Sequence, residues 1–251
     1  MKKFAIVFAV ALAFTPLAAR ATFAQAADTV QSVVEKHLTA MGGRDALMKI
    51  TSRKATGTVA ISTPAGDLTG PVELYSKAPT KSRAVLALDL AAVGGPGTLT
   101  IEQIFDGVTG WSLNPMQGDQ EITGTQLENM RNAFFPSPFL QKDSPDKLEL
   151  LPRETVNGKA WIVMKITRPS GNFVTVYFDP ATYLVARTVT TIDNPMGGTM
   201  QQSGESQDYR TVDGIKVPFT VINSNELQTL TIKLAKVEHN VAIDDAMFKK
   251  K

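Results

Sequence analysis

The chain has 251 residues, of which 26 are Lys or Arg and 24 are Asp or Glu, and it contains no cysteine. The absence of cysteine excludes disulfide bonds, thiol catalysis and a lipid-modified cysteine anchor. With His37 and His239 as the only histidines, the sequence also offers too few ligands for a Cys/His zinc site.

The first 26 residues have the three parts of a secretory signal peptide. Lys2 and Lys3 precede an apolar run over Phe4–Phe14, and small residues follow up to Ala26. The apolar run has about a dozen residues, fewer than the roughly 20 that span a bilayer. We therefore expect cleavage near Ala26, no transmembrane segment in the mature chain, and a soluble periplasmic protein that is not lipid-anchored.

Removal of the signal peptide changes the charge of the chain. Lys2, Lys3 and Arg20 leave with it, so 23 of the 26 basic residues remain against 24 acidic ones. The mature net charge is about −1, which removes the argument for nucleic acid or an anionic membrane surface as a partner. The remaining residues 27–251 contain no linker-like segment, so a single domain is expected.

A helix is predicted at the start of the mature chain. Apolar residues recur at helical spacing from Val30 to Met41, and Asp28 with Gln31 forms a predicted capping box. Gly42-Gly43 is expected to end the helix. His37 lies on the apolar stripe, where a packed, hydrogen-bonded core residue is favoured over a ligand.

From Lys54 onward the apolar period changes from that of a helix to that of a strand. Turn-forming residues separate the runs, as at Asp106-Gly107, and this regular spacing favours an antiparallel meander. The predicted strands are Lys54–Ser62, Leu68–Lys77, Lys81–Leu90, Thr98–Phe105, Thr109–Leu113, Lys147–Thr155, Lys159–Arg168, Phe173–Asp179, Leu184–Asp193, Thr199–Tyr209, Ile215–Asn223 and Leu227–His239.

The hairpin around Asp106-Gly107 carries large apolar groups on both faces, so it is expected to be covered on both sides, or on one side and by the mouth of a cavity. The alternation places Leu99, Ile101 and Phe105 on one face of the hairpin, and Ile104, Trp111 and Leu113 on the other.

At the end of the chain, Asp244-Asp245 is expected to cap a half-turn that packs Met247 and Phe248 against the sheet.

The strand pattern is interrupted between the two halves of the chain. Thr125 and Glu128 form a second predicted capping box, which opens a short helix. The aromatic segment Phe135–Leu140 follows, and its prolines prevent a long helix. This segment either closes one end of the core or forms a movable lid over a ligand cavity, and the sequence leaves both alternatives open.

The predicted fold class is mainly β: a curved antiparallel half-barrel of about 10–12 strands, with an N-terminal helix and a short helical cap. An open sheet of this size must curl or split. Curling gives a concave inner face that the helices can cover. The alternative is two packed sheets with a solid core.

The sequence offers no credible active site. It contains no G-x-S-x-G motif, and the loop Gly94–Gly97 is not followed by the Lys-Ser/Thr of a phosphate loop. Asp244 and Asp245 are adjacent, so they favour a helix cap over a catalytic carboxylate pair. We therefore expect a protein that is not an enzyme and needs no cofactor or metal.

Several turn and cap motifs resemble those of the exported outer-membrane lipoprotein-sorting proteins, the LolA-like and LolB-like superfamily. The resemblance covers most of residues 27–251. It implies a half-barrel closed by helices, with an apolar cavity that holds acyl chains or other lipids. The motifs that carry it are Ala40–Leu47, Phe105–Trp111, Tyr209–Pro218 and Ile243–Phe248.

The leading hypothesis is a non-enzymatic periplasmic carrier or binding protein for lipoprotein acyl chains or another apolar lipid. The alternative is an interaction module for another envelope protein, with the same fold and a filled core. The predicted ligand-binding residues of the cavity and cap are Leu86, Leu88, Ile101, Trp111, Met130, Phe134, Phe135, Phe139 and Met164.

Overall fold

The computed structural model describes residues 28–64, 66–156, 158–194 and 197–250. The predicted signal peptide and its cleavage site therefore lie outside the described residues. Among the described residues, no helix has both the length and the apolar character needed to cross a lipid bilayer.

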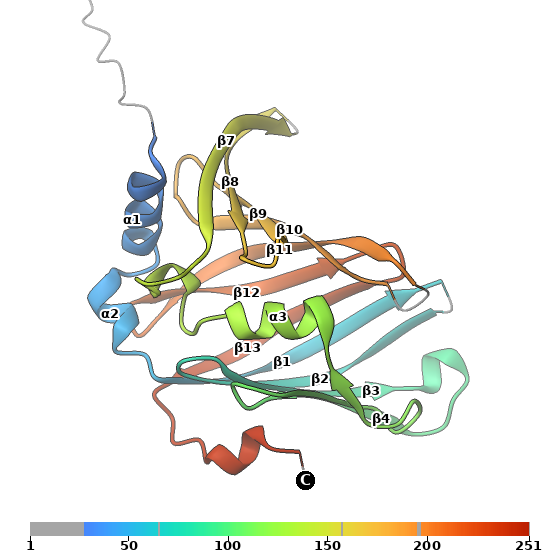
Figure 1. Cartoon of the computed structure of the whole chain (residues 1–251). Helices are drawn as coiled ribbons and strands as arrows, with labels where there is room; N and C mark the ends of the chain where they lie inside the picture. Colours follow the sequence, from blue (N-terminus) through green and yellow to red (C-terminus); the bar gives the residue numbers. More distant parts are fainter. Residues whose placement is uncertain (1–27, 65, 157, 195–196, 251) are drawn as a thin grey trace, which may run out of the picture.

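The fold is one antiparallel sheet of 13 strands, curved into a half-barrel that does not close (Figure 1). This confirms the mainly β half-barrel and makes the alternative of two packed sheets wrong. The sheet order is β6-β5-β4-β3-β2-β1-β13-β12-β11-β10-β9-β8-β7. The strands are β1 Ser52–Thr63, β2 Gly66–Lys77, β3 Lys81–Asp89, β4 Thr98–Phe105, β5 Gly110–Leu113, β6 Gln120–Ile122, β7 Lys147–Val156, β8 Lys159–Thr167, β9 Phe173–Phe178, β10 Val185–Asp193, β11 Thr199–Val212, β12 Ile215–Ser224 and β13 Thr229–His239.

The helices are few and short, and they lie along the inner side of the curved sheet. In Figure 1, α3 crosses in front of β13 and β1, while α1 and α2 stand at one end. They are α1 Val30–Ala40, α2 Arg44–Met48 and α3 Gly124–Asn132, with the 3₁₀ turns η1 Ala91–Val93, η2 Pro138–Leu140 and η3 Asp245–Phe248.

The strand register places apolar side chains on one face of the sheet. Val72 lies opposite Leu86, which lies opposite Ile101 in the next strand. At the other side of the sheet, Val176 lies opposite Met164 on the same face. Since strand side chains alternate between faces, this inner face collects the apolar side chains of β2 to β4 and of β8 and β9.

Three buried clusters stabilise the inner face. One lies beneath α1 and α2 and includes Leu38, Leu47 and Phe219. A second joins Val33 of α1 to β8 and β9. The third lies within β1 to β4 and centres on Leu88, which is fully buried.

The opposite face of the central hairpin is covered by the end of the chain. Asp244 caps η3, which contacts β3 through Arg83, the partner of Ile104 on this face. Phe248 of η3 is 1% exposed and Ile104 is 2% exposed. Phe105, on the inner face, is 0% exposed. The expectation that both faces of this hairpin are covered is confirmed, as is the capping role of Asp244.

Both predicted capping boxes are wrong in detail. Helix α1 begins one residue later than expected, and Thr29 with Ser32 forms its capping box. Asp28 instead forms ion pairs with Lys36 and Arg153. Strand β6 was not predicted, because its three residues are too short for alternation to register.

Candidate functional site

Helix α3 is held at its amino-terminal end by polar contacts with the end of β10. The Thr125 backbone N–H donates to Asp193 Oδ2 at 3.0 Å, and its hydroxyl donates to Oδ1 at 3.2 Å. Thr123 is the N-cap residue without a side-chain capping bond, so Thr125 is not the predicted cap. The first turn of α3 thus satisfies part of its free N–H groups through a distant strand.

Glu128 extends this attachment to the turn between β8 and β9. Its carboxylate accepts hydrogen bonds from the Ser170 hydroxyl at 2.5 Å and from the Asn172 side-chain amide at 2.6 Å. Burial raises the pKa of Glu128, but these two hydrogen bonds outweigh it and the pKa lies below its ordinary value. Glu128 is therefore charged at neutral pH when it accepts these two hydrogen bonds.

The other end of α3 reaches the opposite limb of the sheet. The Arg131 side chain donates to the Val108 carbonyl oxygen, in the turn between β4 and β5, at 2.9 Å. Met130 lies over Gly110 of β5, where its sulfur is 3.3 Å from the position a Cβ would take. Helix α3 is therefore a strap that joins the two limbs of the half-barrel across the inner face.

The apolar side chains of this strap are not fully buried. No residue of α3 is in the buried class, and Leu127 and Met130 are of intermediate exposure. Phe134, just after the helix, is also of intermediate exposure. Full burial of such side chains contributes about 1.5–3 kcal/mol each. Polar contacts at both of its ends fasten the strap.

The segment after α3 is fixed more firmly. The Phe135 backbone N–H donates to the Pro79 carbonyl oxygen at 2.7 Å. Phe139 of η2 contacts the His37 ring edge-on, with ring centroids 5.1 Å apart, and His37 meets Phe178 of β9 in the same way at 5.4 Å. This aromatic cluster joins the cap, α1 and the sheet.

His37 is a buried core residue, as expected. It is 4% exposed, and its Nδ1 lies 2.9 Å from the Tyr183 carbonyl oxygen, which it bonds as a neutral Nδ1–H donor. Burial lowers the pKa of His37 below its ordinary 6.5, although the bond to Tyr183 acts in the opposite direction. The folded protein therefore resists protonation of this ring.

His37 is expected to make stability fall in acid. Below pH 6.5 His37 becomes protonated in the unfolded chain but stays neutral in the folded protein. The free energy of unfolding therefore decreases as the pH falls, until the pH reaches the lower pKa of folded His37. The slope is at most about 1.4 kcal/mol per pH unit.

Urea unfolding from pH 7.5 to 5 should show a steeper loss of stability in the native chain than in His37→Gln. His239, whose pKa is also lowered, is present in both proteins. Parallel curves would contradict the assignment.

The predicted ligand residues fall into two groups on the inner side and one exception. Leu86, Leu88 and Ile101 lie together in the cluster of β1 to β4, and Met164 lies in the cluster of β8 and β9. Met130 lies in the strap and Phe134 follows it. Phe135 belongs to the cluster beneath α1 and α2, and Phe139 packs against that cluster and the one of β8 and β9. Trp111 does not join them. It lies opposite Ile104, on the other face of the hairpin, where Lys250 covers its ring at 4.1 Å.

Local sequence patterns do not reveal the polar residues that hold α3, which are Asp193, Ser170 and Asn172. Asp193 and Ser170 are 68 and 42 residues away from their α3 partners, and no local pattern links them. The only available signal was Glu128, which was interpreted as part of a cap.

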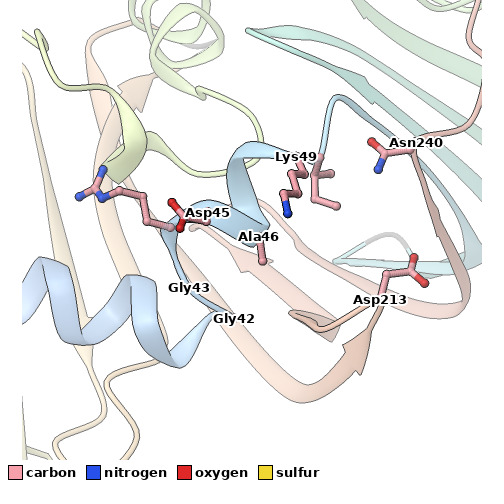
Figure 2. A pocket seen from close by; sticks show the side chains of 9 residues that line it. Gly42, Gly43, Asp45, Ala46, Lys49, Asp213 and Asn240 are labelled. Carbon is pink, nitrogen blue, oxygen red and sulfur yellow. The ribbon is translucent and has the colours of Figure 1, made fainter.

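A groove of about 580 Å³ lies where the turn between α1 and α2 meets Asp213 and the end of β13 (Figure 2). Figure 2 shows Lys49 and Ala46 on one side, with Asp213 and Asn240 on the other. Asn240 is already engaged, since its Oδ1 accepts from the Thr51 backbone N–H at 2.9 Å. The groove contains none of the predicted ligand residues.

No protein-family model matches the sequence, and no curated protein matches it either. Solved structures do match. A DUF1329 family protein from Desulfovibrio piger superposes with a TM-score of 0.58 at 14% identity, covering 89% of this chain and 98% of that one. A LolA superfamily protein from Nitrosomonas europaea gives 0.55 at 14% identity, covering 89% and 99%. A domain named for outer membrane lipoprotein sorting, from Vibrio parahaemolyticus, gives 0.53 at 10% identity, covering 86% and 94%.

These matches establish that the chain has a LolA-like fold. The resemblance seen in the turn and cap motifs is thereby confirmed at the level of the fold. At 14% identity or less, the shared fold does not transfer a ligand or partner to this chain.

Proposed function

We propose that this protein is an exported, non-enzymatic carrier or binding protein that holds an apolar acyl ligand between the inner face of the half-barrel and the α3 strap. Residues 27–251 form its single working domain in this proposal, and the periplasm is its compartment. The observation that carries the proposal is the strap, an amphipathic helix fastened by polar contacts at both ends above the inner face of the sheet, with no buried residue of its own.

The chemistry of the two surfaces suits an acyl chain. Leu86 and Ile101 on the sheet, and Leu127 and Met130 on the strap, present flexible aliphatic groups and no carboxylate. An acyl chain gains roughly 0.8 kcal/mol for each methylene removed from water. A ligand between sheet and strap would also bury the strap's own apolar residues, so both partners gain.

The polar ends make the strap removable. Hydrogen bonds at the surface contribute only about 0.5–1.5 kcal/mol each, so the attachments at Asp193, Ser170 and Val108 can be exchanged for water at modest cost. An apolar core contact would be far more expensive to open. The arrangement therefore supports entry and release of a ligand by movement of α3.

Native mass spectrometry of the mature protein from a periplasmic extract tests the proposal. A discrete extra mass that organic extraction removes, and that is identified as a lipid, is the expected result. A bare mass that remains bare after incubation with acyl lipids would overturn the carrier function. Recovery of one stoichiometric envelope protein with the bare chain would favour an interaction module instead.

A further inference from the structure

Arg53 of β1 is a half-buried cation without an acidic partner among the residues that the structure describes. It lies on the inner face with Ala55, two residues further along the same strand, which is 1% exposed. None of the ion pairs formed by the described residues includes Arg53. Burial lowers the pKa of Arg53 to about 10, with no neighbouring charge to oppose it.

The contacts of Arg53 leave most of its donors unused. Its Nε–H donates to His239 Nε2 at 3.2 Å, and its guanidinium carbon lies 5.1 Å from the centre of the Phe135 ring in the cap. The two terminal NH₂ groups make no hydrogen bond with a described residue, and neither is among the polar atoms sealed from solvent. They remain open to a ligand.

Asp213 approaches Arg53 without forming an ion pair with it. Asp213 Oδ2 lies 3.2 Å from His239 Nδ1, and it reaches Arg53 only through that neutral imidazole. The Asp213 side chain is 64% exposed, so water screens its charge. The hydrogen bond to His239 orients the guanidinium by fixing one of its five N–H groups. The two terminal NH₂ groups remain without a carboxylate partner among the described residues.

We infer that Arg53 binds the anionic head group of the acyl ligand, a carboxylate or phosphate, with the acyl chain extending over the apolar inner face. A guanidinium fork matches the paired oxygens of both groups, and low polarity strengthens the bond. Phe135 lies against both the guanidinium and the buried cluster that contains Ala55. The inference rests on the proposed carrier function and adds the charge of the ligand to it.

The first test compares two ligands of equal chain length in the native protein. Palmitic acid and its methyl ester are each titrated below their aggregation limits against a bound fluorescent fatty alcohol. At least tenfold tighter binding of the acid is expected. Equal binding would refute the role of Arg53 and leave the carrier function standing, whereas failure of both ligands to bind would remove both proposals.

Variants assign the preference to one side chain. Arg53→Gln should lose the preference for the acid while binding the ester as before, and Arg53→Lys should keep part of it. Arg210→Gln is the matched control, because Arg210 also lies over a ring, that of Phe219 at 4.4 Å, but is paired with Asp208 at 2.6 Å. A preference that survives in Arg53→Gln would overturn the inference.

Three further ligands identify the source of the anion. Hexadecyl phosphate should bind with the same dependence on Arg53 as palmitic acid. Acetate and inorganic phosphate should not displace the probe at the same concentrations, because they lack the acyl chain. If Arg53 binds these small anions as tightly as the lipids, the site belongs to a free anion and the lipid assignment is wrong.

Discussion

A disulfide that fixes the α3 strap to β10 is expected to block ligand uptake. In Thr125→Cys with Asp193→Cys, the thiols replace two groups that already touch, with the Thr125 N–H 3.0 Å from the Asp193 carboxylate. The chain has no other cysteine, so no competing disulfide can form. If entry requires α3 to leave the sheet, the oxidised protein should take up a fluorescent fatty acid roughly a hundredfold more slowly, because opening costs a few kcal/mol in such local transitions.

Reduction provides the control within the same sample. Dithiothreitol should restore uptake, and each single cysteine variant should behave like the native chain with or without it. Stopped-flow fluorescence measures the rates, and mass determination under denaturing conditions confirms the bond. Equal rates in the oxidised and reduced double variant would show that the ligand does not pass beneath α3.

Replacement of Phe178 is expected to cause the largest loss of stability. Its side chain is 0% exposed and contacts both His37 of α1 and Phe139 of η2. Truncation to Ala leaves a cavity where helix, cap and sheet meet, at a cost of about 3–5 kcal/mol in the free energy of unfolding. Urea unfolding monitored by circular dichroism gives this value directly.

Phe173 offers a matched control for the Phe178→Ala variant, because it lies in the same strand and is 42% exposed. Phe173→Ala removes the same chemical group but loses chiefly the contact with Lys165, whose Nζ lies 4.3 Å from the ring centre. It should cost no more than about 1 kcal/mol. Comparable losses in the two variants would mean that Phe178 does not join the three elements as described.

Local patterns determined much of the architecture. Alternation and turn residues placed twelve of the strands to within a few residues, and the Asp106-Gly107 turn separates β4 from β5. The apolar stripe of α1 identified His37 as a core residue, and Asp244 as a cap followed from its position before Met247. Each of these depends on neighbours only a few positions away in the chain, where sequence period and turn chemistry dominate.

The site depended on contacts that only the curved sheet creates. Thr125 and Glu128 have the spacing of a capping box. In the fold Thr125 instead bonds Asp193 of β10, and Glu128 bonds Asn172 in the turn between β8 and β9. The alternation correctly paired Trp111 with Ile104, but which face of the sheet lies inside is set by the direction in which thirteen twisted strands curl.

Arg53 looks like an ordinary strand cation in the sequence. In the fold the segment after α3, β1 and the end of β13 meet around it, and it forms no ion pair with a described carboxylate. Twist and register add up over the whole sheet, so distant side chains are brought together by a geometry that no short segment encodes.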